Sequence, residues 1–355
     1  MSRIVGTGTA LPPHRYPQRT LTDAFAQVVL GEGGDRRVLD RLHEATEVQF
    51  RHLALPLEAY AGLDGFGASN DAFIEVGTEL GERAVSAALV ASGLDPVDVD
   101  VIMTTSVTGV AAPSLDARLV PRLGLRPDVK RVPVFGLGCV AGAAGIARVH
   151  DMISGDPDAV AVLLSVELCS LTIQRDDASM ANLVGSGLFG DGAAAVVVVG
   201  DARAAGLGRP SAPAVVATRS RFYPGTERVM GWDIGGSGFR IVLSASVAEV
   251  VEEHLGHDVT AFLGDHDLKI DDIDTWVAHP GGPKVLHAMA RTLGLPADAL
   301  ARTWQSLAQV GNLSSASVLH VLDDTLQAPP PEPGSHGLLL AMGPGFCSEL
   351  VLLRW

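Results

Sequence analysis

The sequence predicts an α/β fold in which two halves repeat the same alternation of strands and helices. Short apolar segments, each long enough for one strand, alternate along the chain with alanine-rich helical segments. Each half is expected to end in an apolar hairpin around a glycine turn, at Gly190-Asp191-Gly192 and at Gly343-Pro344-Gly345. A Gly/Ala/Pro-rich stretch between these hairpins marks the boundary, so the halves are expected to span 1–205 and 206–355.

The strands and helices of the first half follow one another with clear turns between them. Both faces of the expected strands are apolar, as in a sheet that helices cover on two sides. We expect these strands at 3–6, 100–105, 132–135, 159–165 and within 188–200. Helices are expected over 22–47, interrupted by a turn at Gly31–Gly34, over 68–93, and from the region of Cys139 to Ile153.

The second half repeats this order with different residues. A helix at 245–255 leads to a strand at 275–278 and then to the turn His279-Pro280-Gly281-Gly282-Pro283, which opens another helix. A further helix is expected to begin at 311–315 and to run to Leu322. Apolar strands at 337–342 and 348–353 complete the chain.

The composition fits a globular enzyme and argues against several other classes of protein. Hydrophobic residues make up 47% of the 355 residues and charged residues only 19%, which argues against a disordered chain. The formal net charge is −15 and no basic stripe occurs, so we expect no nucleic-acid partner. The apolar runs are far shorter than a bilayer span, and the first residues lack the pattern of a secretory signal. We therefore expect a cytoplasmic protein with no membrane span.

Cys139 is the strongest candidate for a nucleophile. The three cysteines, Cys139, Cys169 and Cys347, show neither a disulfide framework nor the spacing of metal ligands. Cys139 follows a predicted strand, among glycines, at the first turn of a predicted helix. Backbone N–H groups and the helix dipole at such a position favour a thiolate and are expected to lower the pKa of Cys139. A buried structural cysteine is the alternative, and the tight strand–turn–helix context argues against it.

His279 and Asn312 are candidate partners of this cysteine. His279 ends a strand and opens a glycine-rich turn, so its imidazole can project into a cleft and donate to a thioester carbonyl. Asn312 follows Gly311 at a second helix start, where a simple capping role is the alternative. Together with Cys139, its amide can stabilise a developing oxyanion.

The segments around these three residues resemble the type III polyketide synthases, the chalcone synthase-like branch of the thiolase superfamily. The resemblance extends from about residue 3 to the C-terminus. It is strongest at Phe135–Gly145, Gly187–Ala195, Trp276–Leu286, Gly311–Leu319 and Gly343–Phe346. It implies a thiolase-like fold with five layers, αβαβα, formed by two pseudo-duplicated halves.

The resemblance also implies a chemistry and its substrates. Cys139 would take an acyl group from a CoA-thioester starter, and His279 and Asn312 would hold a malonyl-type CoA extender while it loses CO2. Repeated condensation would lengthen the chain by two carbons per round. No metal or redox cofactor is implied, because the CoA thioesters are themselves the substrates. The resemblance also implies a homodimer, and an acyl carrier protein stays open as a further acyl donor.

Residues of the pocket and of the CoA site follow from the same resemblance. Phe189 and Phe239 match two phenylalanines at the junction of the CoA tunnel and the pocket. Further pocket positions are Thr105, Cys169, Thr172 and Ser314. The CoA phosphates would meet Arg41, with Arg36, Arg37 and Lys284 as further candidates; a solvated surface charge is the alternative for each.

Three further segments of the sequence predict the class of product. Glu167–Thr172, Gln174–Asp177 and Met230–Asp233 resemble the actinobacterial enzymes that make alkylresorcinols and alkylpyrones. Two other functions stay open. One is a ketoacyl-ACP synthase of the initiating type, which performs a single condensation. The other is an inactive acyl-CoA-binding partner subunit, against which the presence of Cys139 argues.

Overall fold

The central feature of the computed structural model, which describes residues 1–30, 35–209 and 212–355, is a pair of sheets joined edge to edge. Within these residues the strand order is β11-β12-β13-β8-β1-β7-β6-β4-β5. The first sheet contains β1 (Ser2–Ala10), β4 (Val101–Ser106), β5 (Lys130–Phe135), β6 (Val160–Leu168) and β7 (Asp191–Gly200). The second contains β8 (Ala214–Phe222), β11 (Ile273–Ala278), β12 (His336–Gly343) and β13 (Cys347–Arg354). Only two residue pairs, Ser2 with Val215 and Arg3 with Ala214, connect β1 to β8.

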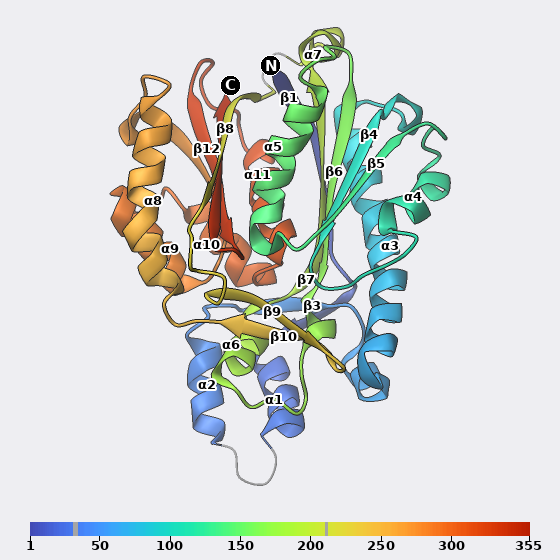
Figure 1. Ribbon diagram of the computed structural model, residues 1–355, viewed down its shortest axis with the longest axis vertical. Helices are drawn as coiled ribbons and strands as arrows, with labels where there is room; N and C mark the ends of the chain where they lie inside the picture. Colours follow the sequence, from blue (N-terminus) through green and yellow to red (C-terminus); the bar gives the residue numbers. More distant parts are fainter. Residues whose placement is uncertain (31–34, 210–211) are drawn as a thin grey trace.

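The helices form three layers that alternate with the two sheets (Figure 1). The outer layer on the first sheet consists of α3 (Gly65–Ser92) and α4 (Leu115–Leu123). The middle layer consists of α5 (Ala141–Ile153) and α11 (Ser317–Gln327). The outer layer on the second sheet consists of α8 (Val247–Gly264), α9 (Pro283–Leu293) and α10 (Ala301–Val310).

The alternation of side chains along β12 shows how one strand serves two of these layers. Leu338 and Leu340 pack with the outer helices, whereas Leu339 and Ala341 pack with α5 and α11. A strand that is apolar on both faces is what two-sided cover requires. The five-layered αβαβα order predicted from the sequence is therefore confirmed.

The two halves share strand order and direction. β4 is parallel to β6, β6 is antiparallel to β7, and β7 is antiparallel to β1. In the second half, β11, β12, β13 and β8 repeat this pattern. In each half a middle-layer helix, α5 or α11, precedes the corresponding strand, β6 or β12. Cys139 and Asn312 therefore both lie in segments ahead of a middle-layer helix, α5 for Cys139 and α11 for Asn312.

Several predicted elements need correction. Gly190-Asp191-Gly192 is not a hairpin turn, because α6 (Met180–Leu188) precedes it and joins β6 to β7. Gly343-Pro344-Gly345 does join two antiparallel strands, β12 and β13. The predicted turn at 31–34 lies outside the described residues. The proposed boundary at 205/206 lies within α7 (Asp201–Gly206) and stays a prediction.

The sequence patterns also missed elements that surround the lower end of the sheets in Figure 1. Two small antiparallel sheets pair β2 (His14–Pro17) with β3 (Phe50–Leu53), and β9 (Met230–Gly235) with β10 (Gly238–Leu243). Beside them lie α1 (Gln18–Val29) and α2 (Arg36–Glu44), which correspond to the helical region predicted over 22–47. Across the described ranges, no helix is long and apolar enough to cross a membrane.

Gly142 allows the two middle helices to approach closely. A Cβ atom at this position would lie 2.4 Å from the Ser315 carbonyl oxygen and 2.6 Å from Val318 Cγ1. Both distances are shorter than real Cβ contacts, so a side chain here would push α11 away from α5.

We predict that Gly142→Ala destabilises the protein, because the added methyl group meets backbone that cannot move aside. Overpacking of this kind costs about 1–3 kcal/mol, which thermal unfolding followed by circular dichroism measures as a lowered Tm. Gly155→Ala is the matched control, since nothing lies within 4 Å of a Cβ atom there. An unchanged Tm for Gly142→Ala would show that the helices do not depend on this contact.

Candidate active site

Cys139 lies in a tight turn between β5 and α5. The turn is a short 3-10 helix over Gly138–Val140, and Cys139 itself is buried. Gly138 adopts a φ of +60°, and a Cβ atom there would lie 2.6 Å from Pro344. The Gly-Pro-Gly turn between β12 and β13 therefore packs directly on the turn that carries the cysteine, and only glycine fits at position 138.

The segment ahead of α11 meets Cys139 from the other half of the molecule. The Sγ atom of Cys139 lies 3.6 Å from Ser314 Oγ. The Asn312 side-chain oxygen accepts hydrogen bonds from Ser314 N (2.8 Å) and Ser317 Oγ (3.4 Å), so Asn312 caps the start of this helical segment. Its Nδ2 group makes no hydrogen bond within the described parts of the chain. The capping contact thus orients the carboxamide and leaves its two N–H donors available.

His279 follows the last residue of β11 and is held by backbone hydrogen bonds. Its N–H donates to the Leu340 carbonyl (3.0 Å), and its carbonyl accepts from Gly281 N (2.9 Å). The imidazole is buried, and within the described residues its Nδ1 atom has no hydrogen-bond partner. Burial lowers the pKa of His279 to about 3, so the ring is neutral near pH 7.

The protonation state of Cys139 differs from the one expected from the sequence. Burial raises the pKa of Cys139 to about 12; the hydrogen bond with Ser314 lowers it, and the nearby Glu167 carboxylate raises it further. The prediction that the helix start lowers the pKa of Cys139 is therefore wrong, because loss of water around the sulfur raises it. A thiolate at this position requires a nearby proton acceptor.

Glu167 links two walls of the site from a fully buried position. One carboxylate oxygen accepts from Thr108 Oγ1 (2.8 Å) and Val107 N (3.1 Å) after β4. The other accepts from Ser315 Oγ (2.5 Å), next to the residue that contacts Cys139. Burial raises the pKa of Glu167, and these hydrogen bonds oppose that rise. The carboxylate thereby connects the loop after β4 with the segment ahead of α11.

A small cavity of about 50 Å3 lies beside Cys139, which we call the reaction cavity. Several residues predicted from the sequence line it: Cys139, Cys169, Thr172, Phe189 and Ser314. The sequence patterns missed other lining residues, among them Ser186, Met230, Trp232, Ile241 and Pro344. Met230 and Trp232 belong to a segment that supported the resemblance, but no spacing in the sequence indicates that the β9–β10 hairpin covers this cavity.

Two predicted pocket residues lie beside the reaction cavity and not on its wall. Phe239 packs among aromatic rings, with centroid distances of 5.4 Å to Phe66, 6.0 Å to Phe135 and 5.9 Å to Trp232. Thr105 is buried at the end of β4 and shares a hydrogen bond of 2.8 Å with Ser165. Phe239 therefore packs behind Trp232, which lines the cavity, whereas Thr105 is held away from it at the end of β4.

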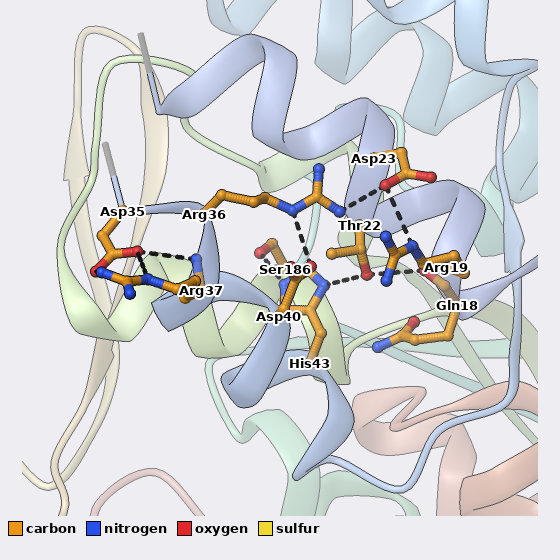
Figure 2. A network of polar contacts seen from close by, with 10 residues as sticks. All are labelled: Gln18, Arg19, Thr22, Asp23, Asp35, Arg36, Arg37, Asp40, His43 and Ser186. Carbon is orange, nitrogen blue, oxygen red and sulfur yellow. Dashed lines mark hydrogen bonds and ion pairs between the residues drawn. The ribbon is translucent and has the colours of Figure 1, made fainter. Parts of the chain in front are cut away.

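The four predicted CoA-binding cations fall into two groups. Figure 2 shows that Arg36 pairs with Asp23 (2.5 Å) and Asp40 (2.8 Å), and that Arg37 pairs with Asp35 (3.3 Å). Arg41 and Lys284 are exposed, and neither forms an ion pair with a residue that the structure describes. The charges of Arg36 and Arg37 are thus largely compensated within the protein, whereas Arg41 and Lys284 are better suited to meet phosphate.

The chain is similar to known proteins along nearly its whole length. Residues 1–202 match the N-terminal domain, and residues 214–355 the C-terminal domain, of chalcone and stilbene synthases. The chain is 59% identical to a 1,3,6,8-tetrahydroxynaphthalene synthase of Streptomyces peucetius over 99% of its length and 93% of that protein. It is 35% identical to a putative chalcone synthase of Bacillus subtilis, over 100% of this chain and 99% of that one.

A solved structure leads to the same family. The crystal structure of 1,3,6,8-tetrahydroxynaphthalene synthase from Streptomyces coelicolor, titled a bacterial type III polyketide synthase, superposes with a TM-score of 0.91 and 29% identity. The match covers 99% of each chain. The chain therefore belongs to the chalcone and stilbene synthase family, as a bacterial type III polyketide synthase that transfers acyl groups and condenses them with loss of CO2.

Proposed function

We propose that this enzyme condenses malonyl-CoA units into 1,3,6,8-tetrahydroxynaphthalene. The observation that carries the proposal is the 59% identity, over 99% of the chain, to a protein with that activity in its name. The ten-carbon skeleton of this product corresponds to five two-carbon units, so malonyl-CoA alone can supply every carbon.

In the proposed first step, Cys139 attacks the thioester carbonyl of the starter. The new bond joins sulfur to the acyl carbon, the bond to CoA breaks, and CoA leaves as its thiol. Because Cys139 is a buried thiol in the resting enzyme, its proton has to pass to a base. We assign this role to the neutral imidazole of His279.

In the second step, a malonyl-CoA extender loses CO2 and the electron pair left behind forms an enolate. His279 and the Nδ2 group of Asn312 donate to the enolate oxygen. Preorganised donors of this kind are each worth about 3–4 kcal/mol in the transition state. The enolate carbon then attacks the carbonyl carbon of the acyl group on Cys139, the bond from that carbon to sulfur breaks, and Cys139 leaves as the thiolate. The acyl chain is now two carbons longer and is attached to CoA.

Alkylresorcinols or alkylpyrones are the second candidate product class. The segments that led to this expectation include Met230–Asp233, which contributes three residues, Met230, Gly231 and Trp232, to the reaction cavity. The two candidates differ in the starter, because an alkyl product requires an acyl-CoA with a preformed alkyl chain.

The CoA contacts and the assembly state also stay proposals. Arg41 and Lys284 are assigned to the CoA phosphates because they are exposed and form no ion pair with the described residues. The homodimer implied by the family resemblance fits the exposure of the β5 edge strand, whose last residue, Phe135, is 47% exposed. Light scattering of the purified chain checks the dimer, and a monomeric mass would contradict it.

We predict that Cys139→Ala lowers the rate of CoA release from malonyl-CoA by at least about 10³-fold, as expected for loss of a nucleophile. Cys169→Ala is the matched control, because Cys169 is a second buried thiol on the same cavity. Mass spectrometry of peptides from the acylated enzyme is expected to show the acyl group on Cys139. An acyl group on Cys169 instead would reassign the nucleophile.

We predict that malonyl-CoA alone is sufficient for an aromatic product. Liquid chromatography with mass detection is expected to show a compound with the mass and retention of authentic 1,3,6,8-tetrahydroxynaphthalene. The same assay with added long-chain acyl-CoA tests the second candidate. A product that forms only when acyl-CoA is present would contradict the proposal and favour the alkyl products.

A further inference from the structure

The C-terminal end of α6 is a junction where several distant segments of the chain meet. The helix ends at Leu188, and Phe189, which lines the reaction cavity, follows it. The last carbonyl groups of a helix have no partner within that helix, so other segments have to supply the donors. Three consecutive carbonyls find their donors in three different segments: Gly187 in Gln18, Leu188 in Asn312 and Phe189 in Arg51.

The bond to the Leu188 carbonyl fixes the backbone of Asn312. Asn312 N donates to this carbonyl at 2.9 Å, and the Asn312 carbonyl accepts from Gly190 N at 3.0 Å. The two bonds form a parallel β-bridge between Phe189 and Asn312. The end of α6 therefore sets the position of Asn312, and with it the position of the carboxamide.

Arg51 of β3 holds this junction from a buried position. Its side chain donates from Nη1 to the Phe189 carbonyl (2.8 Å) and from Nε to Gln18 Oε1 (3.0 Å), and the residue is 2% exposed. Gln18 extends the contact, because its Nε2 donates to the Gly187 carbonyl (2.7 Å). Arg51 thus fixes, directly or through Gln18, the carbonyls on either side of the one that binds Asn312.

The aliphatic part of Arg51 packs on the residue that precedes Asn312. Gly311 adopts a φ of +75°, and a Cβ atom there would lie 2.8 Å from the Leu188 carbonyl oxygen and 3.1 Å from Arg51 Cγ. Only glycine fits in this space with this backbone conformation. Arg51 therefore lies against the residue before Asn312 and also bonds the residue that is bridged to Asn312.

The charge of Arg51 suits this place at the end of a helix. Within the described ranges Arg51 forms no ion pair, so its bonded N–H groups serve the junction alone. Burial lowers the pKa of Arg51 to about 10, against the opposing effect of nearby Asp191, so the guanidinium stays charged near pH 7. A cation is favourable where the carbonyl dipoles of a helix end, and charged donors form stronger hydrogen bonds than neutral ones.

We propose that Arg51 is a positioning residue for Asn312, which it places by holding the end of α6 to which Asn312 is bonded. This inference rests on the proposed function, in which the Asn312 carboxamide donates to the enolate oxygen. A displacement of about 1 Å at a reacting centre can lower a rate about 10²-fold. The inference thus adds a residue that acts on the reaction through Asn312.

The test follows the decarboxylation of malonyl-CoA, in which CO2 leaves and the enolate takes up a proton to give acetyl-CoA. Arg51→Met keeps an apolar stem but removes the donors, so kcat for acetyl-CoA formation should fall at least about tenfold, with KM changed less than about twofold. Arg51→Lys keeps the charge and one donor group and should recover part of this loss. Arg203→Met is the matched control: Arg203 is a partly buried arginine in α7, at the opposite end of the sheets (Figure 1), and its variant should keep the wild-type kcat.

A double-mutant cycle with Asn312→Ala separates positioning from general support of the fold. If Arg51 acts through Asn312, Arg51→Met should lower kcat less than about twofold once the Asn312 carboxamide is absent. The same cycle with Arg51→Lys gives the answer if the Met variant does not fold.

The outcomes separate this inference from the proposed function. An equal loss of kcat from the Arg51 variant with and without the Asn312 carboxamide would show general support of the fold and overturn the inference. A wild-type kcat for folded Arg51→Met would also overturn it, and the proposed function would stand in both cases. If Asn312→Ala alone keeps the wild-type kcat, the proposed role of Asn312 fails first.

Discussion

The close contact between α5 and α11 is the constraint on which the rest of the structure depends. These two helices form the middle layer between the sheets, and Gly142 lets them approach because a Cβ atom there would lie 2.4 Å from the Ser315 carbonyl oxygen. The residues ahead of both helices therefore come to one point, where Cys139 contacts Ser314 at 3.6 Å. Asn312, which caps the same segment, is positioned by the same contact.

Burial then sets the electrostatic character of the site. The sulfur of Cys139 and the imidazole of His279 are both removed from water, so each resting group favours its neutral form. The chemistry proposed here uses this state, because a neutral imidazole can accept the thiol proton and afterwards donate to an oxyanion. The buried Glu167 carboxylate contributes in a different way, since it connects the loop after β4 to Ser315 and holds two walls of the cavity together.

The sequence predicted the features that depend on local structure, and it missed those that depend on packing. The strand–turn–helix position of Cys139 and the strand-end position of His279 follow from nearby glycines and apolar runs. Strands that are apolar on both faces predicted sheets covered on two sides, and the five layers were implied by the family resemblance. Trp232 was missed as a cavity residue because its hairpin pairs only with itself and reaches the cavity through tertiary packing. Phe239 was expected on the wall, but contacts with neighbouring aromatic rings hold it behind the wall. The pKa of Cys139 was predicted wrongly, because the position of a residue at the start of a helix does not show how deeply its side chain is buried.

The central claim is that the imidazole of His279 takes the proton of a thiol that burial would otherwise keep protonated. The pH dependence of iodoacetamide inactivation, measured for wild-type enzyme and for His279→Ala, tests it most directly, with the exposed His257→Ala as control. A thiol that gives its proton to His279 reacts at lower pH than one without an acceptor, so the claim predicts a midpoint for His279→Ala at least about one pH unit above the wild-type value. Identical midpoints for the two proteins would contradict the claim.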